Sequence, residues 1–216
     1  MAGQGMLASF RRALVLGAHC DDEFGCAGAI MRLLEEGVDV FYAAFSACEE
    51  SVPPEFDRDI LRREVKEAIA VLGIPQENFF LYDYPVRHFP DHRQEILETL
   101  IQLRAKLAPD LVLLPALSDI HQDHAVVAHE GVRAFKHATV LGYELPMNTI
   151  SSTHTCFVEL ERRHVERKLV HARCYQSQQA RPYFRPEFLE GLAAVRGVQM
   201  NVEAAEAFEV IRLCLR

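Results

Sequence analysis

Tryptophan is absent from the 216 residues of this chain, and the six cysteines form no Cys-x-x-Cys pair. The cysteine spacing argues against both a structural zinc knuckle and a disulfide scaffold, so we expect a reduced, cytoplasmic protein. No apolar run approaches the roughly 20 residues that a membrane-spanning helix needs. A Gly-x-Gly-x-x-Gly turn, which marks dinucleotide-binding folds, is also missing.

The charge balance is acidic, since 23 Lys and Arg residues stand against 31 Asp and Glu residues and give a formal net charge of −8. A nonspecific duplex-DNA binder needs a basic face for the phosphates, so we expect no nucleic-acid partner. Half of the residues are hydrophobic and a quarter are charged, as in ordinary globular proteins. We therefore predict one domain over residues 1–216, made of a start (1–10), a core (11–145) and a less regular extension (146–216).

Apolar runs alternate with amphipathic stretches through the first two thirds of the chain. The runs predict strands over residues 12–18, 39–45, 79–82, 110–115 and 139–145, and the amphipathic stretches predict helices over 24–36, 57–72, 94–107 and 124–135. This alternation is typical of an α/β, Rossmann-like fold with a mostly parallel sheet and helices on both faces. In the extension we predict strands over 155–160 and 207–213 and helices over 162–175 and 187–195.

The first polar cluster follows the first predicted strand, where residues 17–23 read Gly-Ala-His-Cys-Asp-Asp-Glu. Open α/β sheets place their ligand sites at the carboxyl ends of strands, which is where this cluster lies. His19 and Asp22 are good zinc ligands, and the adjacent Asp21 could serve as a base for a water molecule. The acids could instead cap the following helix, because Asp and Glu stabilise helix N-termini.

A second polar cluster follows the fourth predicted strand, where residues 121–124 read His-Gln-Asp-His. Loops that follow neighbouring parallel strands converge above the same edge of the sheet, so the two clusters should meet. Together they predict a three-ligand metal site with an open position, the pattern of catalytic metals. The alternative is a pair of polar loops with hydrogen-bonded histidines and helix-capping acids.

The two motifs resemble those of the PIG-L/LmbE-like zinc-dependent N-deacetylases, which carry Ala-His-Pro-Asp-Asp-Glu after the first strand and His-x-Asp-His after a later one. This chain has Ala-His-Cys-Asp-Asp-Glu over residues 18–23 and His-Gln-Asp-His over 121–124. Weaker likenesses extend over nearly the whole chain, at residues 48–49, 62–64, 143–144, 175–178 and 205–208. Cys20 departs from the pattern, because the family usually has proline there, and a thiol so close to a metal could bind adventitious metal or oxidise.

The resemblance implies a role for each residue of the two motifs. The implied metal ligands are His19, Asp22 and His124. The implied metal is Zn²⁺, and Fe²⁺, Co²⁺ or Mn²⁺ could occupy the same donors. Asp21 would be the general base for a water molecule, and His121 would polarise the acyl carbonyl. Asp123 would hold His121 in a useful tautomer, and the leaving amine would receive its proton from Asp21 or His121.

Substrate contacts are less determined by the sequence. Residues 84–93 follow the third predicted strand and interleave cations with aromatic rings, so Arg87 and His88 could hold a sugar or an anionic phosphate. A polar surface loop is the alternative reading of this stretch. Arg62 and Arg63 pose the same choice, and we expect one of the two to be surface only. The resemblance adds Glu49 and Tyr143 to the candidate substrate-binding residues.

Five of the ten histidines lie outside these stretches and show no paired spacing. They are His129, His137, His154, His164 and His171. We expect each of them to be exposed to solvent or to make a local hydrogen bond.

The resemblance implies a zinc-dependent hydrolase that removes the N-acetyl group of an amino sugar, glycoside or sugar nucleotide and releases acetate. A metal-activated water suits this reaction, because an amide is a poor electrophile with a poor leaving group. With no apolar anchor in the sequence, we expect a small soluble N-acetylated sugar rather than a membrane lipid, and a homo-oligomer as the assembly. Two alternatives stay open: a metal-dependent hydrolase of another amide or ester, and a noncatalytic module that binds a sugar or metabolite.

Overall fold

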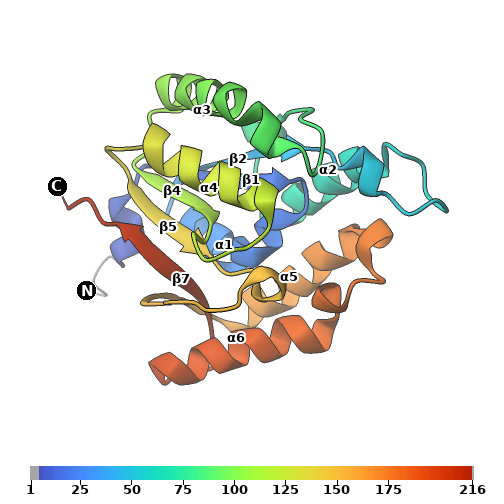
Figure 1. Cartoon of the computed structure of the whole chain (residues 1–216). Helices are drawn as coiled ribbons and strands as arrows, with labels where there is room; N and C mark the ends of the chain where they lie inside the picture. Colours follow the sequence, from blue (N-terminus) through green and yellow to red (C-terminus); the bar gives the residue numbers. More distant parts are fainter. Residues whose placement is uncertain (1–4, 216) are drawn as a thin grey trace.

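The structure is a computed structural model that describes residues 5–215, so the first four residues of the predicted start, and residue 216, lie outside it. Its centre is a sheet with the strand order β3-β2-β1-β4-β5-β7-β6 (Figure 1). The strands are β1 (Arg12–His19), β2 (Asp39–Ser46), β3 (Phe79–Leu81), β4 (Leu111–Pro115), β5 (Thr139–Tyr143), β6 (Cys156–Leu160) and β7 (Ala204–Arg212). Pairs among the first five strands are parallel, and β7 runs antiparallel to both β5 and β6. The predicted α/β fold with a mostly parallel sheet is confirmed.

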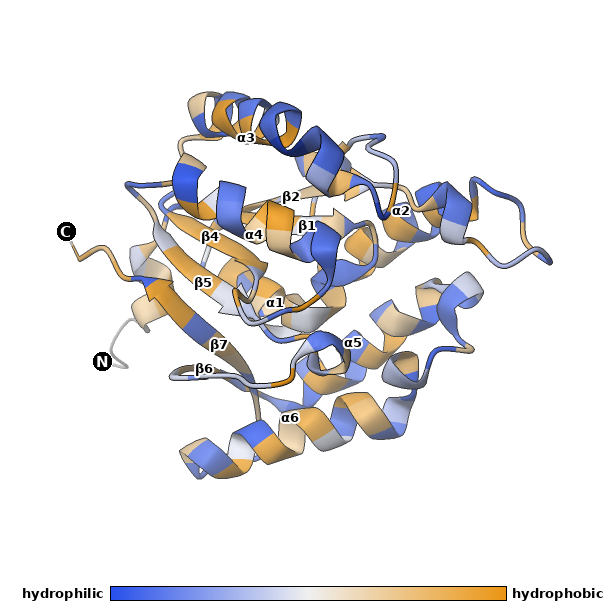
Figure 2. Ribbon diagram, in the orientation of Figure 1, coloured by the Kyte–Doolittle hydropathy of each residue, from blue (hydrophilic) through white to orange (hydrophobic). Residues whose placement is uncertain are grey.

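Helices cover both faces of this sheet within the described residues. They are α1 (Ala27–Glu35), α2 (Ile60–Leu72), α3 (Arg93–Leu107), α4 (Gln122–Ala134), α5 (Arg162–Cys174) and α6 (Pro186–Met200). One hydrophobic core joins the sheet to α1, α2, α5 and α6, and a second joins its other face to α3 and α4. In Figure 2 the strands β4 and β5 are largely hydrophobic, whereas the helices alternate between hydrophobic and hydrophilic residues, as amphipathic helices do.

The helix predicted over residues 24–36 is shorter in the structure, because Asp22–Cys26 forms a 3₁₀ turn and α1 begins at Ala27. A carboxylate that is distant in the sequence binds the N-terminus of α1. Glu206 on β7 accepts hydrogen bonds from the backbone N–H groups of Gly28 and Ala29 at 2.9 and 2.7 Å. These bonds satisfy N–H groups that the first turn of a helix leaves without partners. The C-terminal third of the chain therefore helps to shape the segment that follows the first polar cluster.

The C-terminal third is more regular than its sequence indicates. Strand β7 lies between β5 and β6, so this part of the chain completes the sheet. Helix α6 begins at Pro186 and continues to Met200, well beyond the predicted end at residue 195. Asn201 ends it with a positive φ of 59°, a conformation that asparagine tolerates better than most residues. The predicted division of the chain at residue 146 stays a prediction.

Candidate active site

The two polar motifs follow neighbouring strands, because β1 ends at His19 and pairs in parallel with β4, which ends at Pro115. The chain runs outward from β1 to β3 and then returns to β4, so the strand order reverses at this pair. Ligand sites of open α/β sheets lie at such a reversal, beyond the carboxyl ends of the strands. There Nε2 of His124 lies 3.0 Å from Nδ1 of His19. The prediction that the two motifs meet is confirmed.

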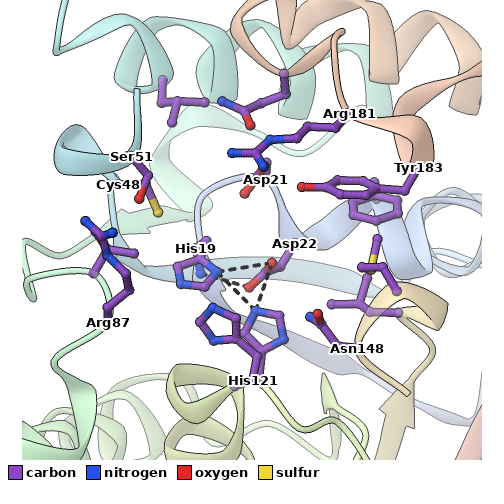
Figure 3. A pocket seen from close by; sticks show the side chains of 17 residues that line it. His19, Asp21, Asp22, Cys48, Ser51, Arg87, His121, Asn148, Arg181 and Tyr183 are labelled. Carbon is purple, nitrogen blue, oxygen red and sulfur yellow. Dashed lines mark hydrogen bonds and ion pairs between the residues drawn. The ribbon is translucent and has the colours of Figure 1, made fainter. Parts of the chain in front are cut away.

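An open cavity of about 310 Å³ lies above these histidines. Figure 3 shows His19 and Asp22 facing one another at its floor, with Asp21 above them. The walls come from the loops after β2, β3 and β5 and from the segment between α5 and α6. A concave site of this size, with polar groups converging at its floor, has the character of a small-molecule site.

Three donor atoms at the floor have the spacing of metal ligands. Oδ1 of Asp22 lies 3.6 Å from Nδ1 of His19 and 3.4 Å from Nε2 of His124, and the two nitrogens are 3.0 Å apart. Ligands bound tetrahedrally to zinc at about 2.0–2.1 Å stand about 3.3 Å from one another. The triangle therefore has the size that a tetrahedral zinc site requires.

Two buried carboxylates orient the histidine rings. Nε2 of His19 lies 3.1 Å from Oδ2 of Asp123, and Nδ1 of His124 lies 2.7 Å from Oδ2 of Asp119. An ionised carboxylate only accepts hydrogen bonds, so each ring donates from that nitrogen and turns the lone pair of its other nitrogen toward the site. Asp119 was not predicted as a site residue, because an acid in a loop next to a histidine motif carries no distinguishing signal.

The donor atoms at the floor need a positive charge among them. Two lone pairs and a carboxylate oxygen at these distances repel one another unless positive charge lies among them. Burial by itself lowers the pKa values of both histidines, but the charge of Asp22 and the neighbouring carboxylates outweigh it, raising the pKa of His19 to about 9 and that of His124 to about 10. A divalent metal ion would supply the positive charge that the protons otherwise bring, so the donor set fits a metal.

His121 is close enough to belong to the same cluster. The donor atoms of His19, His121 and His124 all lie within 4.8 Å of one another. Nδ1 of His121 accepts a hydrogen bond from the backbone N–H of Asp123 at 3.2 Å, which leaves the ring proton on Nε2. Burial, and then the two neighbouring histidines, lower the pKa of His121, so a neutral imidazole is favoured. The ring can thus offer an N–H donor to the cavity that it lines.

Asp123 does not make the contact with His121 that the sequence analysis expected of its carboxylate. Only its backbone N–H reaches that ring, while its fully buried carboxylate lies against His19. The same carboxylate accepts hydrogen bonds from the backbone N–H groups of Arg87 at 2.6 Å and Phe89 at 3.3 Å. The physical reason is that Asp123 stands in the first turn of α4, with its side chain directed at the end of β1 and at the loop after β3. The carboxylate of Asp123 therefore links His19, one of the expected metal ligands, to the loop after β3.

Asp21 lines the cavity above the floor and is half-buried. Its carboxylate has no hydrogen bond to another side chain among residues 5–215. Burial, and then the negative charge of Asp22, raise its pKa to about 7. A general base that works near neutral pH needs a shift in this direction, because an ordinary carboxylate is too weak a base.

The structure brings Arg87 to the cavity but leaves His88 at the surface. Arg87 has a positive φ of 71°, held by the hydrogen bond from its N–H to Asp123, and its side chain lines the cavity 3.9 Å from Glu50. A residue without glycine's freedom in this conformation is strained, and such strain is kept where the surrounding structure holds it. The side chain of His88 is exposed and lies 3.6 Å from Asp91.

Glu49 and Arg62 line a neighbouring hollow of about 170 Å³. Nε of Arg62 donates to Glu49 at 2.7 Å, and its guanidinium also contacts Asp83. Arg63 lies elsewhere, with its exposed guanidinium 3.1 Å from Asp57. Arg63 therefore lies on the solvated face of α2, and we expected one of the two arginines to be surface only.

Tyr143 lies in the hydrophobic core and has no exposed surface. Its hydroxyl donates a hydrogen bond to the carbonyl of Leu16 at 2.9 Å. The structure therefore places this candidate substrate contact beneath the sheet edge, where it ties β5 to β1.

Several wall residues, among them two aromatic rings and an arginine, were not predicted from the sequence. Phe24, Arg181 and Tyr183 line the cavity, and the Tyr183 ring stacks on Phe24 with centroids 5.8 Å apart and an interplanar angle of 12°. Phe24 looks like an ordinary helix residue in the sequence, and the other two fall in a stretch without periodicity. Only the packing of the C-terminal third against the 3₁₀ turn after β1 brings them to the site.

A buried polar cluster supports the loop that carries the first motif. The carboxylate of Glu23 lies 3.0 Å from the hydroxyl of Tyr42 and also contacts the hydroxyl of Tyr175. These two hydroxyls lie 3.0 and 2.8 Å from the carbonyls of His19 and Cys20. The loop between the motif's histidine and its acids is thus anchored from below.

His171 belongs to the same cluster. It is fully buried and places Nε2 2.8 Å from Glu23, although 148 positions separate the two residues. The expectation that His171 is exposed or locally hydrogen-bonded is therefore wrong. The sequence of an amphipathic helix places a histidine at the surface by default, because it carries no signal for a hydrogen-bond partner that is distant in the chain.

Cys20, which stands where the family motif usually has proline, is also fully buried. Burial, and then nearby Cys48 and acidic groups, raise the pKa of its thiol well above the usual range. A buried protonated thiol is a poor metal ligand and a slow nucleophile, so the structure offers no support for adventitious chemistry at this position.

Comparison with known proteins places this geometry in a family. A family model described as "PIG-L: GlcNAc-PI de-N-acetylase" matches residues 14–135, which is more than half of the chain. The matched part contains both polar motifs, α1 to α4, most of β1 and the whole of β2 to β4. No curated protein matches the chain.

Several solved structures share the fold. The N,N'-diacetylchitobiose deacetylase from Pyrococcus horikoshii has a TM-score of 0.79 at 20% identity and covers 94% of this chain and 84% of that one. GalB, the 4-carboxy-2-hydroxymuconate hydratase from Pseudomonas putida KT2440, has a TM-score of 0.77 at 20% identity, with 95% and 98% covered. The zinc-inhibited form of teicoplanin deacetylase Orf2 has a TM-score of 0.73 at 14% identity, with 91% and 96% covered. At such identities the likeness establishes the fold.

Proposed function

Because the chain belongs to the PIG-L family of de-N-acetylases, we propose that it is a zinc-dependent hydrolase that removes the N-acetyl group of a small amino sugar, glycoside or sugar nucleotide. The observation that carries this proposal is the triangle of Asp22 Oδ1, His19 Nδ1 and His124 Nε2, with sides of 3.0 to 3.6 Å, at the floor of a cavity that Asp21 also lines. Two of the similar solved structures are deacetylases by name, which supports the choice of reaction.

His19, Asp22 and His124 would hold the metal, and the ring of His121 lies beside them. When bound, a zinc ion supplies Lewis-acid activation of a water molecule and of the acyl oxygen. Asp123 and Asp119 would keep the two histidine rings oriented, since each accepts a hydrogen bond from the nitrogen that faces away from the site.

Asp21 would take the proton from the attacking water. Its carboxylate lies above the floor with no hydrogen bond to another described side chain, so it is free to accept a proton. The proton that Asp21 has taken would then pass to the amine nitrogen as the C–N bond breaks. One carboxyl group would thus act first as base and then as acid.

His121 would stabilise the developing charge on the acyl oxygen. Its Nδ1 is occupied by the backbone N–H of Asp123, so Nε2 carries the proton and can donate it in a hydrogen bond. A donor that is already oriented needs no reorganisation during the reaction, and removing one such donor typically costs about 10²–10³ in kcat.

The test is acetate release from a panel of N-acetyl sugars by protein stripped with a chelator and reloaded with one equivalent of Zn²⁺. We expect turnover to depend on the metal and to fall by several orders of magnitude in Asp21→Asn, which keeps the side-chain shape. The fold also occurs in a hydratase, so acetate must be measured rather than substrate loss alone. Absence of acetate with every sugar, or full turnover in Asp21→Asn, would overturn the proposed reaction or the proposed base.

A further inference from the structure

One cation on the wall of the cavity has no acidic partner. The side chain of Arg181 lines the cavity, and Figure 3 shows its guanidinium directed over Asp21. Within residues 5–215 this guanidinium makes neither an ion pair nor a hydrogen bond. The other arginine of the cavity, Arg87, lies 3.9 Å from Glu50, and Arg62 in the neighbouring hollow is paired with two acids.

The backbone around Arg181 is well defined. Its N–H donates to the carbonyl of Gln178 at 2.9 Å, and its own carbonyl accepts from the N–H of Phe184 at 3.1 Å. These bonds close two successive turns between α5 and α6. The guanidinium is therefore presented by a structured segment rather than by a long free loop.

Tyr183 provides a flat surface beside this cation. One face of its ring stacks on Phe24, which is itself buried, and its hydroxyl lies near Asp21 and Arg181. Burial, and then the negative charge of Asp21, raise the pKa of Tyr183 to about 12, and the positive charge of Arg181 acts in the opposite direction. The hydroxyl therefore lies within electrostatic reach of both residues. Aromatic side chains of this kind are common walls for small organic ligands.

The negative and positive charges of the cavity are separated in space. The carboxylates of Asp21 and Asp22 lie at and just above the floor, where the amide would react, and the guanidinium of Arg181 lies over them on the wall. An anionic group of the substrate would be attracted at this wall. The planar fork of a guanidinium also matches the oxygens of a carboxylate or phosphate.

We propose that the site takes N-acylated sugars that carry an anionic substituent, a carboxylate or a phosphate ester, and that Arg181 binds this substituent on the cavity wall. The proposal rests on the proposed deacetylase function, because it assigns a substrate class to the same site. It makes Arg181 a specificity-determining residue whose partner is the substrate.

The experiment compares three sugars with the zinc-loaded protein: neutral N-acetylglucosamine, N-acetylglucosamine 6-phosphate and the carboxylate-bearing N-acetylmuramic acid. We expect kcat/KM to be about tenfold to a hundredfold higher for at least one anionic sugar, the gain of one charge-assisted hydrogen-bonded pair. The phosphate and carboxylate arms show which anion the site prefers. The advantage should shrink as salt is raised, because the pair is reached by solvent.

Three variants identify the residue. Arg181→Gln should lower the ratio of kcat/KM for the anionic sugar to that for the neutral sugar to about one, and Arg181→Lys should keep part of this ratio. Arg185→Gln is the matched control, because Arg185 is an exposed arginine in the same segment. Equal losses with neutral and anionic sugars in Arg181→Gln would overturn the proposal, since they would mean that Arg181 serves the site itself.

Calorimetric titration of the same sugars into the zinc-loaded protein separates the two proposals. If no sugar is hydrolysed, the deacetylase function fails, but tighter binding of an anionic sugar that is lost in Arg181→Gln still supports the recognition role. If the neutral and anionic sugars are hydrolysed and bound equally well, the deacetylase function stands and the assignment of Arg181 is overturned.

Discussion

The carboxylate of Glu23 lies 2.8 Å from Nε2 of His171, and neither residue has any exposed surface. This contact joins the loop of the first motif to α5, which lies in the C-terminal third. Nδ1 of His171 has no hydrogen-bond partner among the described residues, so Nε2 is the ring nitrogen that donates to the carboxylate. The cluster then consists of one buried carboxylate in contact with three polar side chains.

Loss of the Glu23 carboxylate should destabilise the protein strongly. In Glu23→Leu, His171 and the hydroxyls of Tyr42 and Tyr175 lose a buried acceptor, so we expect a loss of about 2–4 kcal/mol in the free energy of unfolding. Tyr175→Phe removes one hydroxyl and should cost about 1 kcal/mol. Urea denaturation measures both. A loss in Glu23→Leu no larger than that in Tyr175→Phe would show that the carboxylate is not the centre of the cluster.

Removal of the Asp119 carboxylate should weaken metal binding more than it weakens the fold. Asp119 holds the ring of His124 at 2.7 Å and the backbone N–H of His121 at 2.8 Å. Asp119→Ala should lower the affinity for Zn²⁺ by about 10–100-fold, as measured by competition with a chromophoric chelator. Glu209→Gln is a suitable control, because Glu209 accepts a hydrogen bond from the N–H of Leu117 in the same loop. An equal loss of affinity in both variants would point to the loop and not to the ring.

The ligand set can be decided by comparing His121→Gln with Asp22→Asn. If Asp22 is a ligand and His121 a hydrogen-bond donor, His121→Gln should keep one zinc ion per chain and lose about 10²–10³ in kcat. Asp22→Asn should lose affinity for the metal by at least tenfold. Metal content after gel filtration, together with turnover, makes the comparison. Loss of zinc in His121→Gln with retention in Asp22→Asn would instead identify the three-histidine cluster as the metal site.

The buried ion pair of Lys168 and Glu206 should be sensitive to removal of the lysine. Nζ of Lys168 lies 2.6 Å from Glu206, and both side chains are almost completely buried. Lys168→Met leaves a buried carboxylate without its cation, so we expect a loss of about 3–5 kcal/mol in the free energy of unfolding. The exposed pair of Arg162 and Glu166 is the control, since Arg162→Gln should change stability by less than about 1 kcal/mol. Thermal or urea unfolding distinguishes the two outcomes, and similar losses in both variants would contradict the prediction.

The sequence alone determined the parallel part of the sheet, the helices of the first two thirds and the meeting of the two motifs. Apolar runs and helical spacing report burial locally, and strands that alternate with helices have few arrangements open to them. Because β1 and β4 are neighbours in this arrangement, His19 and His124 were expected to meet, and their nitrogens are 3.0 Å apart. The family resemblance rested on the same two motifs.

Only the tertiary structure decided which acid serves which histidine and what surrounds the metal site. Asp123 turns to His19, and Asp119 holds His124, because the direction of a side chain in the first turn of α4 depends on the loops packed around it. The contact of His171 with Glu23 spans 148 positions, and Arg181 reaches the cavity through the packing of α5 and α6. A hydrogen bond or a cavity wall made by distant segments leaves no periodic signal in the sequence, since its partners become neighbours only when the chain folds.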